Sequence, residues 1–92
     1  MRTTNITIKI QCDIKDIKEI SSVTKDNIKT YIIRFNSIYK AFQFEIMLDY
    51  YHISYVKIKD TIFIDNELNN IRIRYDRISH HNTYDIYIYQ DF

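Results

Sequence analysis

Residues 4–14 read TNITIKIQCDI, in which polar and apolar side chains alternate without a break. Ile6, Ile8, Ile10 and Cys12 fall on one side, and the polar residues between them fall on the other. A period of two over eleven residues predicts a β-strand with one buried face. We expect Cys12 to lie on that face as a small, unreactive thiol.

The next twenty residues extend the β pattern, with one ambiguous segment. Residues 15–24 combine an apolar spacing of three, which favours a helical turn, with a run of Ser, Val and Thr that favours a strand. We favour a strand that ends at a turn over 25–27, where Asn27 can adopt a positive φ in place of glycine. Residues 28–35 are apolar on both sides, which predicts a central strand.

A single helix is predicted from about Ser37 to Tyr51, with Asn36 or Ser37 as the N-cap. At 100° per residue this segment carries two apolar stripes on different sides. We expect the first stripe to face the sheet and the second to remain available for binding. The first is Tyr39, Phe42, Ile46, Tyr50 and Ile53, and the second is Ala41, Phe44, Leu48 and Tyr51.

After the helix the period of two returns in segments 54–59, 61–65, 71–78 and 83–89. The connections between them are short and rich in Asn and Asp, which predicts an antiparallel meander. The expected fold class is therefore α+β, with an antiparallel sheet of six to seven strands and one helix packed on one face.

The composition indicates one domain over residues 1–92 and excludes several functions. The chain has no Gly, so it cannot form a P-loop, a dinucleotide fingerprint or a nucleophile elbow. A net charge of +1 disfavours both an acidic mimic of DNA and a basic arm that coats it. One cysteine and no long apolar run predict a cytoplasmic protein without a signal peptide or a membrane span.

Catalytic and metal-binding residues are not expected. His80 and His81 are adjacent, so in a strand they would point to opposite faces, and with His52 and Cys12 they make no recognisable zinc spacing. No serine lies in a nucleophile motif, and the carboxylates are spread over turns and exposed strand positions. We therefore predict a protein that is not an enzyme and has no cofactor.

The polar faces of the later strands carry the candidate binding residues. If the apolar faces share one core, cationic and aromatic side chains lie together on the outer face of the sheet. Such a surface suits a protein partner, through Tyr and Arg anchors, or single-stranded nucleic acid, through base stacking. The candidates are Tyr55, Lys57, Lys59, Arg72, Arg74, Tyr87 and Tyr89 on the sheet, with Phe44, Leu48 and Tyr51 on the second helix stripe.

In size and composition, with 20 Ile, 9 Tyr and no Gly, the chain resembles the small proteins of phages and mobile elements with AT-rich genomes, among them anti-CRISPR inhibitors. This resemblance implies a protein that inhibits a larger host nucleoprotein complex by occluding a surface or locking its conformation. The leading hypothesis is such an interaction module, with a homodimer as a further form of association. The alternative is a small single-stranded nucleic-acid-binding or regulatory protein that uses the basic and aromatic face of the sheet.

Overall fold

The computed structural model describes residues 5–66 and 71–91 and contains seven strands, one α-helix and two short 3₁₀ turns in this part of the chain. The strands are antiparallel throughout, and the α+β class is confirmed. In chain order the elements are β1 (Asn5–Asp13), η1 (Ile14–Asp16), β2 (Ile17–Lys25), β3 (Ile28–Phe35), α1 (Ile38–Tyr50), β4 (Val56–Ile58), β5 (Thr61–Asp65), β6 (Ile71–Ile78), η2 (Ser79–His81) and β7 (Thr83–Asp91).

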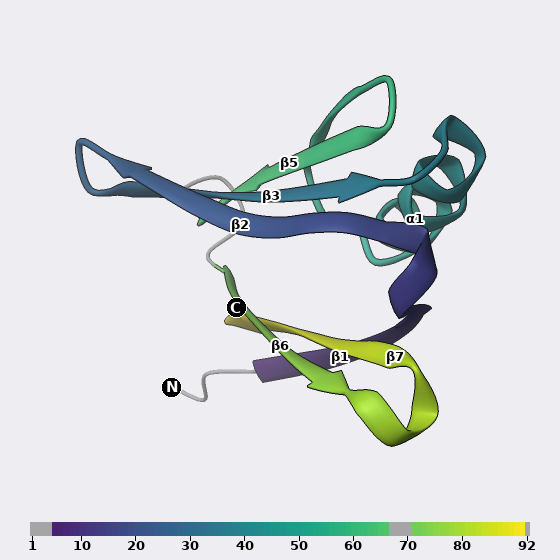
Figure 1. Cartoon of the computed structure of the whole chain (residues 1–92). Helices are drawn as coiled ribbons and strands as arrows, with labels where there is room; N and C mark the ends of the chain where they lie inside the picture. The colour runs from purple at the N-terminus through teal and green to yellow at the C-terminus, as the bar shows by residue number, and fades with distance from the viewer. Residues whose placement is uncertain (1–4, 67–70, 92) are drawn as a thin grey trace.

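The strands form two sheets, so the prediction of one continuous sheet was wrong. One sheet has the order β1-β7-β6 and the other β2-β3-β5-β4. Figure 1 shows the two sheets one above the other, with α1 at one side of them. The predicted meander is broken between β5 and β6, which belong to different sheets. The expected turn over 66–70 lies mostly outside the described residues.

The three-stranded sheet joins the two ends of the chain. β1 pairs with β7 in an unbroken register from Asn5 opposite Asp91 to Asp13 opposite Thr83, and β7 then pairs with β6. The last strand is therefore central in its sheet, between the first strand and its own hairpin partner. This pairing decides which polar residues of β1 lie beside those of β7.

One hydrophobic core receives side chains from both sheets and from α1. The central strand β3 contributes Ile33 and Phe35, and β7 contributes Ile86 and Ile88, each with no more than 2% of its surface exposed. The position of β3 between β2 and β5 agrees with its apolar residues on both sides. The remaining members of the core are Ile8, Ile10, Ile17, Ala41, Phe44, Leu48, Ile53, Ile62, Ile64 and Ile71.

The helix begins as predicted but faces the opposite way. The Ser37 hydroxyl accepts a hydrogen bond from the Lys40 N–H at 3.1 Å, which caps the first turn. Ala41, Phe44 and Leu48 face the core and are at most 3% exposed, so the stripe expected to be free is the buried one. The other stripe faces outward, apart from Ile53, which follows the helix and is buried.

Residues other than glycine adopt the left-handed conformation at the turns. Asp26 and Asn27 have φ of 53° and 66° between β2 and β3, and Asn82 has φ of 55° before β7. Asn and Asp enter this region more readily than most residues, because their short side chains can hydrogen-bond locally, and the positive φ predicted for Asn27 is confirmed. Lys59 (54°) and His52 (57°) also lie in this region. The strand favoured for the ambiguous segment after β1 is confirmed as β2, and a 3₁₀ turn over Ile14–Asp16 precedes it.

Candidate functional site

The outer face of the three-stranded sheet gathers cations and tyrosines from all of its strands. Residues that lie directly opposite each other in antiparallel strands share a face. Tyr87 lies opposite Lys9 of β1 and opposite Arg74 of β6, and Tyr89 lies opposite Arg72. We call these five residues the basic-aromatic face.

The side chains of this face contact one another closely. The guanidinium carbon of Arg74 lies 4.6 Å from the centre of the Tyr87 ring, and that of Arg72 lies 5.1 Å from the Tyr89 ring. Lys9 Nζ lies 6.0 Å from the Tyr87 ring on the β1 side. The two tyrosine rings are nearly parallel, with an interplanar angle of 16° and centroids 6.4 Å apart. The face is thus an ordered set of flat groups, since each ring has a cation within the range of a cation–π contact.

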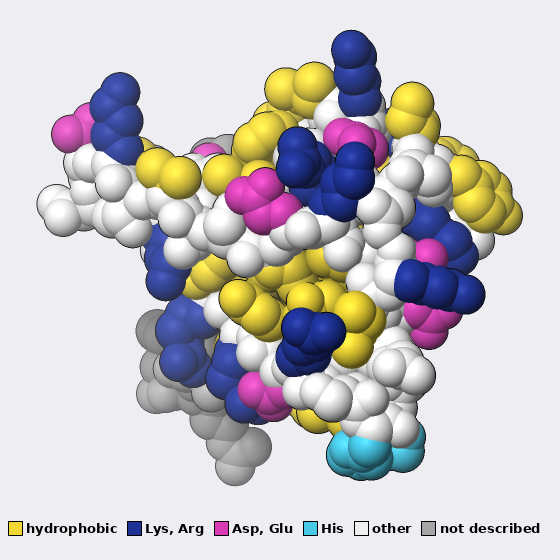
Figure 2. Space-filling model, in the orientation of Figure 1, with side chains coloured by type: hydrophobic (Ala, Val, Ile, Leu, Met, Phe, Trp, Pro, Cys, Tyr) yellow, Lys and Arg dark blue, Asp and Glu magenta, His cyan; other side chains and the backbone are white. Residues whose placement is uncertain are grey.

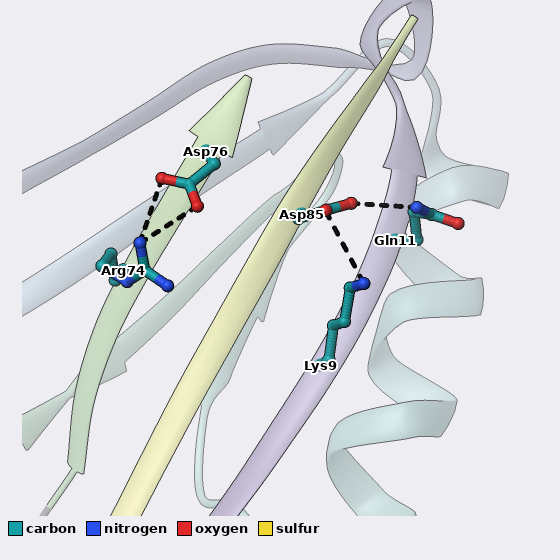
Figure 3. A network of polar contacts seen from close by, with 5 residues as sticks. All are labelled: Lys9, Gln11, Arg74, Asp76 and Asp85. Carbon is teal, nitrogen blue, oxygen red and sulfur yellow. Dashed lines mark hydrogen bonds and ion pairs between the residues drawn. The ribbon is translucent and has the colours of Figure 1, made fainter. Parts of the chain in front are cut away.

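Two carboxylates lie at one end of the same sheet face (Figure 3). Asp85 is 7% exposed, accepts a hydrogen bond from Gln11 Nε2 at 3.0 Å and lies 3.7 Å from Lys9 Nζ. Asp76 accepts from Arg74 at 3.0 and 3.2 Å. Both carboxylates therefore orient cations of the basic-aromatic face.

An open groove borders this face where the two sheets approach each other. Its volume is about 610 Å³. It is lined by Arg72, Ile73, Arg74 and Tyr89 from one sheet and by Lys29, Tyr31 and Asn66 from the other side. Lys29 Nζ lies 5.3 Å from the centre of the Tyr31 ring, which repeats the cation–tyrosine pairing. In Figure 2, Lys and Arg side chains gather at the left of the lower sheet, toward the upper one.

The second candidate surface is the outward side of α1. At about 100° per residue, Tyr39, Ile46 and Tyr50 lie within about 40° of one another and opposite the buried stripe. Yellow side chains reach the surface over α1 at the upper right of Figure 2. We call the exposed residues of this side the outer α1 face: Ile38 (58% exposed), Tyr39 (64%), Phe42 (49%), Ile46 (51%), Met47 (37%) and Tyr50 (74%).

Several predicted site residues have structural contacts instead. Phe44 and Leu48 are buried in the core, so their assignment as binding residues was wrong; the Phe44 ring packs 5.4 Å from that of Phe35. Tyr51 is half-buried against the core, with an edge contact to Tyr50.

The expected outer face divides between the two sheets. Tyr55 and Lys57 belong to the β4 region and contact α1, whereas Arg72, Arg74, Tyr87 and Tyr89 lie together on the other sheet. Lys59 is exposed in the turn between β4 and β5.

Tyr55 holds the start of β4 against the helix. Its hydroxyl lies 2.7 Å from Glu45 Oε2 and 2.8 Å from Asp49 Oδ1, and Lys57 Nζ lies 4.0 Å from Glu45. Burial and the hydrogen bonds to these two carboxylates raise the pKa of Tyr55 above its ordinary value. This contact stabilises the fold and leaves the Tyr55 hydroxyl committed to α1.

Sequence reasoning missed Lys9, Lys29 and Tyr31 as neighbours of the candidate residues. The alternation in β1 already placed Lys9 on the polar side, but nothing in the sequence indicated that β1 pairs with β7. Lys29 and Tyr31 adjoin the face only because β3 of the second sheet begins beside the groove.

The Cys12 thiol is half-buried and has a raised pKa. It lies on the apolar side of β1, as predicted, and burial, followed by the nearby charges of Asp16 and Asp13, raises the pKa of the thiol to about 11. Within residues 5–66 and 71–91, no three His, Cys, Asp or Glu side chains lie close enough to hold a metal ion. No helix in the same ranges is long and apolar enough to cross a membrane.

Comparison of the chain with protein-family models, curated proteins and solved structures gives no match.

Proposed function

We propose that this protein is a non-enzymatic interaction module that binds a larger protein through the outer α1 face. The observation that carries the proposal is the exposure of six large apolar side chains on one helix of 13 residues. A surface helix normally places polar residues opposite its buried stripe. Here both sides are apolar, and contiguous exposed apolar surface of this kind is typical of a binding site.

The residue types on this face suit a protein partner. Tyr39, Phe42 and Tyr50 supply large rings with few rotatable bonds, and aromatic residues are enriched among the residues that contribute most to binding. Their separations of three, eight and eleven residues place them on one side of the helix. A groove on the partner could therefore receive the helix with its apolar side inward.

The finer form of the proposal follows from the resemblance to anti-CRISPR inhibitors. The partner is then a host defence nucleoprotein complex, which the protein inhibits by covering a functional surface or by locking one conformation. A net charge of +1 does not suit imitation of the DNA backbone, so contact through apolar and aromatic side chains is the mechanism that we favour.

The test compares two apolar-to-acid substitutions on different surfaces. Ile46→Asp places a charge at the centre of the outer α1 face, and Val23→Asp places the same charge at a 55% exposed position on β2. Both proteins are expected to fold. We expect the wild type and Val23→Asp to restore phage plating on a strain with an active CRISPR–Cas system, and Ile46→Asp to fail.

Size-exclusion chromatography with light scattering separates a foreign partner from self-association. The proposal is supported if the wild type is a monomer that forms a complex with the purified defence effector, and if Ile46→Asp abolishes this complex while Val23→Asp does not. A wild-type dimer that Ile46→Asp converts to a monomer would identify the face as a self-interface and overturn the inhibitor role. Unchanged activity of Ile46→Asp would also overturn it.

A further inference from the structure

The basic-aromatic face lies on a different element from the outer α1 face and has a different chemistry. Its three cations are held over or beside tyrosine rings at 4.6–6.0 Å, so they are ordered before any ligand arrives. A guanidinium stacked on a ring still presents its N–H groups at its edge, where they can donate to an anion. The face therefore combines anion donors with flat stacking groups.

The nearly parallel tyrosine rings, with guanidinium groups over them, favour a ligand with flat groups of its own. Tyr87 and Tyr89 stand two residues apart on β7 with only 16° between their ring planes. Unpaired bases stack on aromatic rings and on arginine planes, whereas the bases of a duplex are already stacked inside it. An acidic peptide would use the cations but not this arrangement of rings.

We propose that the basic-aromatic face binds single-stranded nucleic acid, with Lys9, Arg72 and Arg74 at phosphates and Tyr87 and Tyr89 under bases. The neighbouring groove extends the path of the nucleic acid across Lys29, near the start of β3 in the second sheet. Its volume of about 610 Å³ and its cationic lining suit a nucleotide of an extended chain.

The carboxylates on this face limit its affinity. Lys9, Lys29, Arg72 and Arg74 are partly offset by Asp76 and Asp85, which leaves a formal charge of +2 on these six residues. Charge alone therefore binds weakly, and stacking contributes a substantial part of the affinity. Asp76 contacts Arg74 directly, so its removal releases a cation for phosphate.

The experiment measures fluorescence anisotropy of labelled 15-nucleotide oligo(dT) and oligo(U) with the full chain at 50 and 200 mM salt. Three phosphate contacts predict a slope of log affinity against log salt of about −2. The double variant Arg72→Gln/Arg74→Gln should lose at least tenfold in affinity at 50 mM salt and flatten the slope by about 1.4. Asp76→Asn should bind at least twofold more tightly.

Stacking is tested by variants and by a probe that keeps the phosphates. Tyr87→Leu and Tyr89→Leu should each weaken binding at least fivefold, and an abasic strand of the same length should bind at least tenfold more weakly. The matched control is Lys18→Gln/Lys25→Gln, which removes the same charge from exposed positions of β2 on the other sheet. It should lose less than threefold.

Several results would overturn the proposal. These are no binding at 50 mM salt, equal binding of the abasic strand, equal competition by duplex DNA or by polyglutamate, and an equal loss in the control. Circular dichroism and the melting temperature establish for each variant that the fold is retained. If the Tyr→Leu variants unfold, two measurements still test the proposal: binding of the abasic strand to the wild type, and binding of the oligonucleotides to Asp76→Asn. Neither of them requires a change in the core.

Discussion

Phe44 of α1 packs against Phe35 of β3 with ring centroids 5.4 Å apart and an interplanar angle of 56°. This contact fixes the helix to the four-stranded sheet and decides which of its two apolar sides is buried. Phe42, two residues earlier, lies on the other side and is 49% exposed. One phenylalanine of α1 is therefore part of the core, and the other is part of the outer α1 face.

Phe44→Ala should lower the free energy of unfolding by about 3 to 5 kcal/mol, the usual cost of a large cavity in a core. Phe42→Ala should cost less than about 1 kcal/mol, because its ring is half in water already. Urea unfolding followed by circular dichroism measures both values. Equal losses in the two variants would contradict the observed orientation of α1.

The sequence was sufficient to locate the elements but not to orient the helix. Both stripes of α1 satisfy the helical period, so periodicity could not choose between them. Two chemical signals favour the observed choice. Ala41, the chain's single Ala, allows close approach to the sheet, and the Tyr39 and Tyr50 hydroxyls would require partners if buried. Residue type therefore carried information that spacing did not.

The sequence pattern likewise could not predict which strands pair. The alternation in β1, β6 and β7 predicted which side chains share a face of each strand, but not which strands are neighbours. A short connection after β5 resembled a hairpin, whereas the chain there passes from one sheet to the other. As a result the prediction placed Lys57 on the same face as Arg72 and did not include Lys9. Lys9 lies opposite Tyr87 because the first strand, β1, pairs with the last, β7.

Lys59 adopts φ of 54° in the turn between β4 and β5, where a side chain with a Cβ is strained. Lys59→Gly should therefore be more stable than Lys59→Ala by about 1 kcal/mol, because only glycine enters this region without strain. The two variants remove the same charge. Thermal unfolding of both therefore measures the free-energy cost of the positive φ alone. A glycine variant no more stable than the alanine variant would show that the turn is unstrained.

The Cys12 thiol should react slowly while the protein is folded. Its pKa is raised to about 11, whereas an unfolded cysteine titrates at about 8.5, so at pH 8 the folded protein holds roughly two hundredfold less thiolate. The rates of alkylation by iodoacetamide at pH 8, with and without 6 M guanidinium chloride, measure this ratio. The alkylation rate of a small free thiol in the same two solutions gives the effect of the denaturant on the reaction itself. A native rate within threefold of the unfolded rate would contradict burial of Cys12.

The contribution of the Tyr55 hydroxyl to the free energy of unfolding should depend on pH. Glu45 and Asp49 are like charges four residues apart on α1, an arrangement that destabilises a helix, and the single Tyr55 hydroxyl hydrogen is shared between them. Tyr55→Phe should therefore lower the free energy of unfolding by about 1 kcal/mol at pH 7.

The pH dependence of that difference separates the hydrogen bonds from packing of the ring. The folded pKa of Tyr55 lies above the unfolded value of about 10, so the hydroxyl's contribution is complete below pH 9 and is lost as the pH rises above about 10, where the unfolded chain gains by ionising. The phenylalanine variant lacks this group, while the other titrating residues are common to both proteins and cancel. Urea unfolding at pH 7, 9 and 10.5 should give a constant difference at the first two values and a smaller one at the third. A difference that persists unchanged at pH 10.5 would mean that the Tyr55 hydroxyl does not hold β4 to the helix.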